Sequence, residues 1–329
     1  MQMGRDDADS LPWWGIVWRG MAMGAADVVP GVSGGTMALV LGIYARFILA
    51  LRNIDVDLLK SALAFVTGGF AAVPREALLA KLKEKDTFFL MILGGGIVTS
   101  IASFAKVIPW LMDQYPAHMN GLFFGMILAS VLVPLRLMGE RGLKQVAAFV
   151  LSTVSAYVFT SLPVFEMSHS LPFLFLSGTV AICAMLLPGV SGSFLLLVLG
   201  QYKYILSALR DLNIPVVVVF SAGCGVGLLG FSRFLSWLFR TYPATTMASL
   251  AGLMVGSLQK IWPYKLTAEA MVVDGKVLSA GRNVLPFDPS YSGDALLPGL
   301  LLLAGAALAY GLERLGHTKE KPAPSVSAG

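Results

Sequence analysis

Two copies of the pentapeptide Pro-Gly-Val-Ser-Gly, at 30–34 and 188–192, are the residues whose types and spacing point most directly to chemistry. Proline removes a backbone donor and ends a helix, glycine permits a turn, and serine caps the helix that follows. The first N–H groups of that helix, together with its dipole, attract anions. We therefore predict a broken helix at each copy, with a compact anion bound between the two breaks.

The predicted breaks and anion ligands repeat from one copy to the other. The breaks are Pro30, Gly31, Pro188 and Gly189, and the ligands are Ser33, Gly34, Gly35 and Thr36 in the first copy and Ser191, Gly192 and Ser193 in the second. A single glycine-rich kink in a membrane helix is more often a packing device than a site. Two copies at matching positions favour the binding interpretation.

Charged residues within apolar segments extend this prediction. Lys106 and Arg233 occupy matching positions in the two halves and are predicted to face a central cavity and pair with the anion. Arg46 and Lys203 either recruit anionic headgroups at the two mouths or lie at the membrane interface. Asp27 precedes the first break only. It either carries a proton or a coupling ion such as sodium, or forms a salt bridge with Arg19 or Lys106.

The composition indicates which elements must position these residues. Of the 329 residues, 56% are hydrophobic and 13% are charged, whereas a soluble domain carries about 25% charged residues. The net charge of +5 arises mostly from Lys and Arg between the apolar runs. We predict an all-α polytopic membrane protein with spans at roughly 14–50, 87–112, 118–138, 145–161, 171–209, 214–238, 245–262 and 296–313.

The distribution of basic residues predicts the topology. Residues 46–85 contain seven Lys and Arg residues and 136–144 contain three, so both connections are predicted to be cytoplasmic, whereas 162–171 contains none. Segments 14–50 and 171–209 must then be re-entrant hairpins, and both termini are cytoplasmic. This path leaves Lys203 and Arg210 facing outward.

The repeat extends beyond the pentapeptide. Residues 30–44 align with 188–202, and 96–117 align with 223–244. The chain is thus predicted to be one membrane domain (1–329) built from repeat one (13–162) and repeat two (171–314), each a re-entrant hairpin plus three transmembrane helices. Because three is odd, the repeats are inverted, which is typical of transporters.

An enzyme is not expected from this sequence. The GVSG letters resemble the G-x-S-G element of rhomboid-type intramembrane proteases, but a serine nucleophile needs a histidine base within reach. None of the three histidines, His118, His169 and His317, lies deep in a later span. There is no metal-ligand spacing, nucleotide-binding loop or nucleic-acid module, so no cofactor and no nucleic-acid partner are predicted.

The stretches A-D-x-V-P-G-V-S-G-G-T at 26–36 and L-P-G-V-S-G-S at 187–193, with the repeat around them, resemble a bacterial membrane family. It was long catalogued only as a domain of unknown function. The family now comprises polyprenyl-phosphate (undecaprenyl-phosphate) translocases of the PopT type. The resemblance covers roughly 13–314. It implies a flippase of the bacterial cytoplasmic membrane that returns the lipid carrier of cell-wall synthesis from the outer to the inner leaflet. The alternative is a channel or secondary transporter for a small soluble anion such as phosphate.

Overall fold

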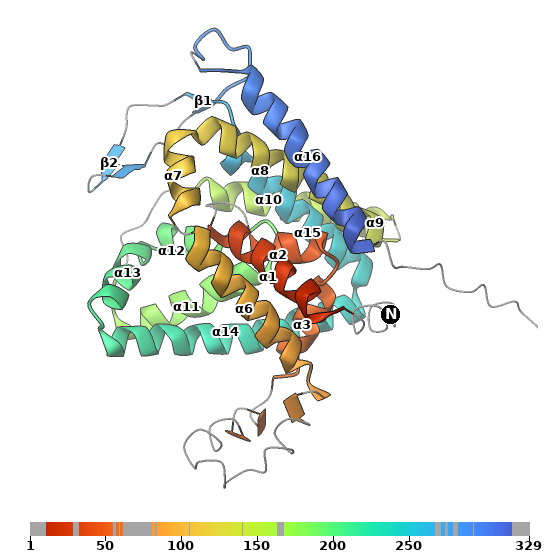
Figure 1. Ribbon diagram of the computed structural model, residues 1–329, viewed down its shortest axis with the longest axis vertical. Helices are drawn as coiled ribbons and strands as arrows, with labels where there is room; N and C mark the ends of the chain where they lie inside the picture. The colour runs from red at the N-terminus through yellow and green to blue at the C-terminus, as the bar shows by residue number, and fades with distance from the viewer. Residues whose placement is uncertain are drawn as a thin grey trace, which may run out of the picture.

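The computed structural model describes residues 11–28, 33–54, 57–58, 60–61, 81–82, 84–104, 106–139, 141–162, 168–266, 271–273, 276–278, 282–291 and 293–317. Within these ranges the chain is almost entirely helical (Figure 1). The α-helices are α1 (Trp13–Val28), α2 (Gly34–Val40), α3 (Tyr44–Arg52), α6 (Thr87–Phe104), α7 (Val107–Gln114), α8 (Pro116–Ser130), α9 (Leu132–Leu137), α10 (Leu143–Thr160), α11 (Leu171–Leu186), α12 (Gly192–Val198), α13 (Tyr202–Arg210), α14 (Ile214–Thr241), α15 (Pro243–Ser257) and α16 (Leu296–His317).

The remaining elements lie between α15 and α16. A 3-10 helix, η1 (Leu258–Ile261), directly follows α15. Strand β1 (Lys265–Leu266) pairs antiparallel with β4 (Arg282–Asn283), and β2 (Met271–Val273) pairs antiparallel with β3 (Lys276–Leu278). These short ribbons depart from the all-α prediction, but only in the connection between two apolar helices.

The chain is a multi-pass membrane protein. Among the described residues, five helices are long and apolar enough to cross a membrane, or up to seven if each of two bent helix pairs is one span. These five are Thr87–Phe104, Pro116–Leu137, Leu143–Thr160, Ile214–Thr241 and Leu296–Arg314. All of them overlap spans predicted from the sequence.

The two long predicted segments, 14–50 and 171–209, each contain a second bend that the sequence interpretation missed. Helices α2 and α3 meet at 119°, and α12 and α13 meet at 105°. Gly42 and Gly200 lie in these bends with φ of 70° and 68°, a backbone region that glycine enters without strain. Each segment therefore consists of three helices instead of two half-helices around one break.

The predicted span 87–112 is interrupted, whereas its counterpart is continuous. Helix α6 ends at Phe104 and α7 begins at Val107, with Pro109 in the first turn of α7. A proline inside a helix removes a backbone donor and clashes with the preceding turn, so Pro109 disfavours one continuous helix through this segment. Ser236 stands at the matching position of α14, which runs for 28 residues without interruption.

Glycines set the closest helix pairs. A Cβ atom at Gly20 or Gly24 of α1 would lie 2.3 or 2.5 Å from carbonyl oxygens of α6, and one at Gly252 or Gly256 of α15 would lie 2.3 or 2.2 Å from those of α10. Helices α8 with α16 and α11 with α14 also pack directly against each other. Small residues allow membrane helices to approach in this way.

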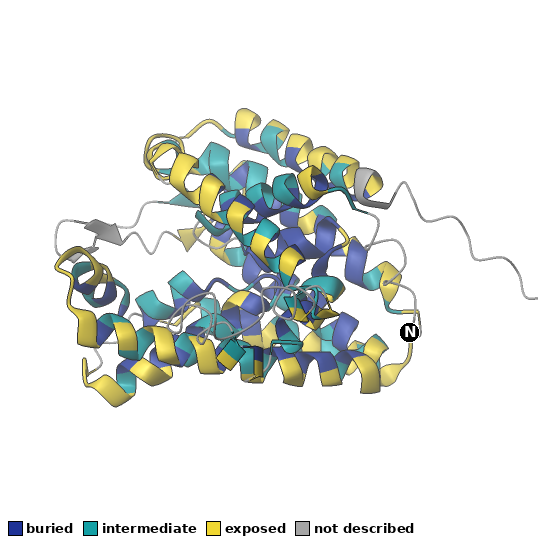
Figure 2. Ribbon diagram, turned by 60° about the horizontal axis from the view of Figure 1, so that its bottom comes forward, coloured by how far each residue is buried: buried dark blue, intermediate teal, exposed yellow. Residues whose placement is uncertain are grey.

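The buried core surrounds the first break. All seven residues of α2 are buried, and Figure 2 shows that buried residues concentrate at the centre of the molecule while the outer helices expose one face. Helix α10 illustrates such an outer helix, because Ala156 is its one buried residue among those described. The core thus encloses α2, and the exposed apolar faces are left for lipid.

Candidate functional site

The first break ends in a capped helix whose leading N–H groups are occupied. Residues 29–32, which include the predicted Pro30 and Gly31, lie outside the described residues. Ser33 has the extended backbone of an N-cap, and its hydroxyl accepts a hydrogen bond from the N–H of Gly35 at 3.1 Å. The carboxylate of Asp27 accepts from the N–H of Gly34 at 2.7 Å. Both donors were predicted to be free for an anion, and they are instead bound within the protein.

Asp27 therefore has a partner that the sequence did not indicate. Neither of the ion pairs considered for it, with Arg19 or with Lys106, is present in the described part of the chain. Arg19 is buried and donates to the carbonyl oxygen of Gly15 at 2.8 Å, and its guanidinium lies over the ring of Trp18. The carboxylate of Asp27 occupies the position at which an external anion would contact α2.

The second break is described completely and is less filled. Pro188 and Gly189 form a turn after α11, with Gly189 at a φ of 84°. Ser191 caps α12, accepts from the N–H of Phe194 at 3.4 Å, and its hydroxyl lies 2.9 Å from that of Ser193. Among the described residues, the N–H groups of Gly192 and Ser193 have no hydrogen-bond partner. This break therefore retains free donors of the kind that bind anions.

The structure brings the second break and the end of α11 into contact with the residues that follow the first break. The N–H of Gly189 donates to the hydroxyl of Thr36 at 2.9 Å, and the hydroxyl of Ser33 lies 3.4 Å from the carbonyl oxygens of Met185 and Leu187. The hydroxyl of Tyr44 donates to the carbonyl oxygen of Leu186 at 2.7 Å. Residues about 150 positions apart thus form one polar centre, although part of its hydrogen-bonding capacity is used to join the halves.

Lys106 and Arg233 are not part of this centre. Lys106 is exposed at the start of α7. Arg233 is exposed on α14, where it donates to the carbonyl oxygens of Leu229 at 2.7 Å and Ile54 at 2.8 Å. It therefore reaches the chain just beyond α3 and lines a polar recess with Arg52, Asn53, Glu84 and Lys85. No contact between either cation and a break residue occurs in the described part of the structure.

Arg46 and Lys203 also differ from each other in their surroundings. Arg46 forms a bidentate ion pair with Asp86, with N–O distances of 2.6 and 2.8 Å, and its guanidinium lies over the ring of Phe89. Lys203 is exposed near the start of α13. A headgroup-recruiting role for Arg46 would require the Asp86 pair to open.

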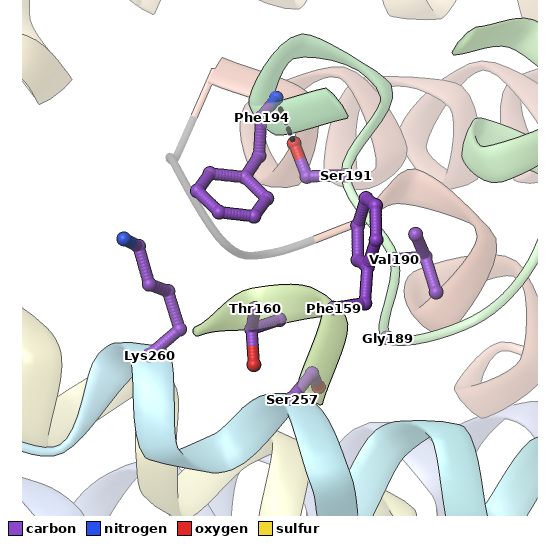
Figure 3. A pocket seen from close by; sticks show the side chains of 8 residues that line it. All are labelled: Phe159, Thr160, Gly189, Val190, Ser191, Phe194, Ser257 and Lys260. Carbon is purple, nitrogen blue, oxygen red and sulfur yellow. Dashed lines mark hydrogen bonds between the residues drawn. The ribbon is translucent and has the colours of Figure 1, made fainter. Parts of the chain in front are cut away.

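A small cavity beside the second break contains a cation that the sequence interpretation missed. It is lined by Phe159, Thr160, Gly189, Val190, Ser191, Phe194, Ser257 and Lys260 (Figure 3). The cavity measures about 10 Å³, room for roughly one water molecule. The ammonium of Lys260 lies 4.5 Å from the centre of the Phe194 ring. Continued at the same offset, the repeat alignment sets Val133 of the first half against Lys260. The charge of Lys260 therefore does not repeat, and the repeated charges gave no indication of it.

Comparisons with known proteins agree on one family. A family model described as VCA0040-like, undecaprenyl phosphate translocase-like, matches residues 23–277. A polyprenyl-phosphate transporter of Vibrio cholerae is 41% identical over 302 residues, which cover 90% of this chain and 94% of the relative. A polyprenyl-phosphate transporter of Staphylococcus aureus is 28% identical over 273 residues, covering 76% of this chain and 86% of the relative. No solved structure matches the chain significantly.

Proposed function

The chain belongs to the VCA0040-like, undecaprenyl phosphate translocase-like family, and we propose that it transports a polyprenyl phosphate, namely undecaprenyl phosphate, across the bacterial cytoplasmic membrane. The direction is from the outer to the inner leaflet, which returns the lipid carrier to cell-envelope synthesis. The observation that carries this proposal is the 41% identity to a polyprenyl-phosphate transporter over 90% of the chain.

The proposed architecture is an inverted repeat in which 14–50 and 171–209 are re-entrant. Matching helix bounds support it: α2 and α12 each have seven residues, α3 and α13 each have nine, and α8 and α15 each have fifteen. The helix pairing matches as well, since α1 packs on α6 as α11 packs on α14. Repeats 13–162 and 171–314 then alternate in exposing one central site to either side.

In this mechanism the phosphate binds at the breaks. Gly192 and Ser193 offer free N–H groups to the phosphate oxygens, and the hydroxyl of Ser191 adds a further donor. The corresponding ligands of the other state are Ser33, Gly34, Gly35 and Thr36. The N–H of Gly34 becomes available when the carboxylate of Asp27 leaves it, and the N–H of Gly35 and the hydroxyl of Thr36 become available when Ser33 and Gly189 release them. Protonation of Asp27, or its binding of sodium, is the proposed coupling step.

The remaining cations act at the two ends of the path. Arg233 and Lys106 are proposed to meet the phosphate where it leaves or enters the centre, since both are exposed and occupy matching positions. Arg46 and Lys203 attract the headgroup at the two mouths. The isoprenoid tail stays in lipid throughout, and the mechanism needs no covalent chemistry.

A binding measurement tests the substrate class. The purified protein is titrated with geranylgeranyl phosphate, a short polyprenyl phosphate, in the presence and absence of excess inorganic phosphate. We expect tight binding that inorganic phosphate barely displaces, because the tail keeps the phosphate in the detergent layer around the protein at a high local concentration, whereas inorganic phosphate stays in bulk water. Equal competition by inorganic phosphate, or no binding of the lipid, would favour a transporter of small soluble anions instead.

Transport itself is tested in proteoliposomes with a fluorescent polyprenyl phosphate placed in one leaflet. Movement of the label to the opposite leaflet at a rate above that of protein-free vesicles is expected. Ser191→Ala is expected to retain partial activity, because the backbone donors of Gly192 and Ser193 remain. A wild-type rate equal to that of protein-free vesicles would refute the proposed function.

A further inference from the structure

Lys260 and Lys265 form a pair of like charges beside the second break. The ammonium of Lys265 donates to the backbone carbonyl oxygen of Lys260 at 2.6 Å, so the Lys265 side chain ends beside the backbone that carries Lys260. Burial, and secondly the charge of Lys260, lower the pKa of Lys265 to about 8. Within the described residues neither lysine forms an ion pair with a carboxylate. Two neighbouring cations without an acidic partner are stabilised when an anion binds between them.

The position of Lys260 is fixed by the residue before it. The side-chain amide of Gln259 donates to the carbonyl oxygen of Tyr157 at 2.6 Å and lies 2.8 Å from the hydroxyls of Thr160 and Ser161. These bonds attach η1 to the end of α10. They hold Lys260 at a cavity whose polar lining includes the hydroxyls of Thr160 and Ser191 (Figure 3). Lys260, Thr160 and Ser191 thus line one cavity from three separate segments of the chain, although the Thr160 hydroxyl already donates to the carbonyl oxygen of Ala156 at 2.8 Å.

The other wall of the same cavity is apolar. The rings of Phe159 and Phe194 meet edge to face at 5.9 Å, and the ring of Phe194 also supports the ammonium of Lys260. Helix α10, which carries Phe159, exposes Leu151, Val154 and Val158 along the rest of its length. A ligand with a charged head and an apolar tail can place the head at Lys260 and let the tail continue along α10 into lipid.

The geometry points to a binding site for the phosphate headgroup of an isoprenoid lipid, formed by Lys260 and Lys265 with the hydroxyl of Ser191. This inference rests on the proposed function and deepens it, because it assigns where the headgroup first docks. On the predicted topology, the ends of α10 and α15 lie at the outer face of the membrane. The headgroup therefore docks first at Lys265 and Lys260. Because the cavity beside them holds about one water molecule, the headgroup reaches the second break only after the cavity has widened.

Binding of geranylgeranyl phosphate to purified full-length variants tests the site. Lys260→Gln and Lys265→Gln should each weaken binding about tenfold or more, because each removes a charged donor to the phosphate. Lys260→Arg keeps the charge and should stay within about threefold of the wild type. Lys144→Gln is the matched control: Lys144 is exposed at the opposite end of α10, and its loss should leave binding unchanged.

Two results separate this site from the proposed function. Wild-type protein that binds the lipid, together with a Lys260→Gln protein that binds it equally well, would overturn the site and leave the function intact. Wild-type protein that binds inorganic phosphate equally tightly, with loss of both ligands in Lys260→Gln, would keep the site and overturn the lipid function.

A second measurement on the wild-type protein avoids any effect of the variants on folding. Lysines are acylated with an amine-reactive reagent and quantified by mass spectrometry, with and without geranylgeranyl phosphate. The lipid should slow labelling of Lys260 and Lys265 and leave Lys144 unaffected. Geranylgeraniol, which lacks the phosphate, should protect neither lysine. Equal labelling of Lys260 with and without the phosphate lipid would overturn the site.

Discussion

The segments that follow the two breaks have the same helix lengths but make different contacts. After the first break, Arg233 and Arg52 join the end of α3 to α14 through Ile54 and Ser236, with Arg52 3.4 Å from the Ser236 hydroxyl. After the second break the equivalent side chains are exposed. Lys106 stands where Arg233 does, and Arg210, the counterpart of Arg52, pairs only with its neighbour Asp211 among the described residues.

The backbone N–H donors that follow the two breaks differ as well, because those of the first are bound within the protein. The leading N–H groups of α2 are bound by Asp27 and Ser33, and the whole helix is buried. The first two N–H groups of α12, those of Gly192 and Ser193, have no partner in the described structure, and only Gly192, Leu195 and Val198 of this helix are buried. Helix α2 is therefore fully buried with its first N–H groups bound, whereas α12 is less buried and retains two free N–H groups.

This difference is informative because the two halves share a sequence pattern. Two inverted repeats that alternate in access must adopt unequal conformations at any one time, since identical conformations would open both sides or neither. On the predicted topology the closed α3–α14 contact lies toward the cytoplasm, and the free donors of α12 face the outer side. Under the proposed alternating-access mechanism, this topology would make the structure the state that accepts substrate from outside.

The largest expected effect tests whether the second break needs its tight turn. Gly189→Ala places a Cβ atom 2.7 Å from the Cα of Met254 and forces a residue other than glycine to a φ of 84°. Strain and overlap together should cost about 3 kcal/mol of unfolding free energy. Thermal unfolding in detergent measures the loss, and transport should fall with it.

Gly230→Ala is the matched control for that variant. Gly230 lies within α14, and nothing stands within 4 Å of an added Cβ atom. Alanine should stabilise this exposed helical position by roughly 0.5–1 kcal/mol. Equal unfolding temperatures for the two variants would mean that the second break is not held in the observed turn.

The next effect tests the unequal contacts of Arg233 and Lys106. Arg233→Gln should lower the unfolding free energy by about 1 kcal/mol, because it weakens the hydrogen bonds to Leu229 and Ile54. Lys106→Gln should leave stability unchanged, since Lys106 is exposed and joins no helices. Transport should fall in both variants if the two cations serve opposite states.

Charge reversal sharpens the same comparison. Arg233→Glu should reduce transport more than Arg233→Gln, because a carboxylate would face the carbonyl oxygens that now accept from the guanidinium. Full activity in Arg233→Glu would remove this residue from the mechanism. Equal stability losses in Lys106→Gln and Arg233→Gln would show that Lys106 makes stabilising contacts between helices as Arg233 does.

Local and distant interactions account for what the sequence did and did not predict. The helix starts at Ser33 and Ser191 follow from Pro, Gly and Ser within a few positions, and the structure confirms both caps. The bends at Gly42 and Gly200 also have a local cause, a glycine at positive φ. They were not predicted because each glycine lies within an apolar segment that reads as continuous helix.

The cavity at Lys260 could not be predicted because it joins residues from α10, the second break and η1. Its charge is also absent from the first half, where Val133 occupies the matching position. Internal symmetry directs attention to repeated residues such as Lys106 and Arg233. The features that distinguish the halves, Asp27 and Lys260, are the ones that do not repeat.

A smaller effect is expected at Asp27, which has no acidic counterpart at the matching position of the second half. Asp27→Asn keeps an oxygen that accepts from the N–H of Gly34, so the helix start should survive with a loss of about 1 kcal/mol or less. The variant cannot gain or lose a proton. Transport in proteoliposomes should therefore stop responding to an imposed proton or sodium gradient, while exchange without a gradient continues.

Asp27→Ala separates charge from capping, because it removes both. It should lose stability relative to Asp27→Asn and should also lack the gradient response. A gradient response that persists in Asp27→Asn would exclude this carboxylate as the coupling group and would leave it as a cap of α2.

The smallest expected effect is a dependence of lipid affinity on pH, which we attribute to Lys265 in the second half of the chain. Because burial and the charge of Lys260 lower the pKa of Lys265 to about 8, this lysine loses its proton in a range where an ordinary lysine keeps it. A phosphate monoester is a dianion above about pH 6. Affinity for geranylgeranyl phosphate should therefore be highest between about pH 6 and 8 and fall about three- to tenfold by pH 9, where only about a tenth of Lys265 is charged.

Lys265→Arg decides whether that alkaline decline belongs to Lys265. Arginine stays protonated at pH 9, so affinity in this variant should remain nearly constant from pH 7.5 to 9. Lys260 is the charged neighbour of Lys265 among the described residues, and its lone charge in Lys265→Gln should give weaker binding than in the wild type. The same decline in Lys265→Arg as in the wild type would assign the pH dependence to another group. The second break would then differ from the first in its free donors and not in its cations.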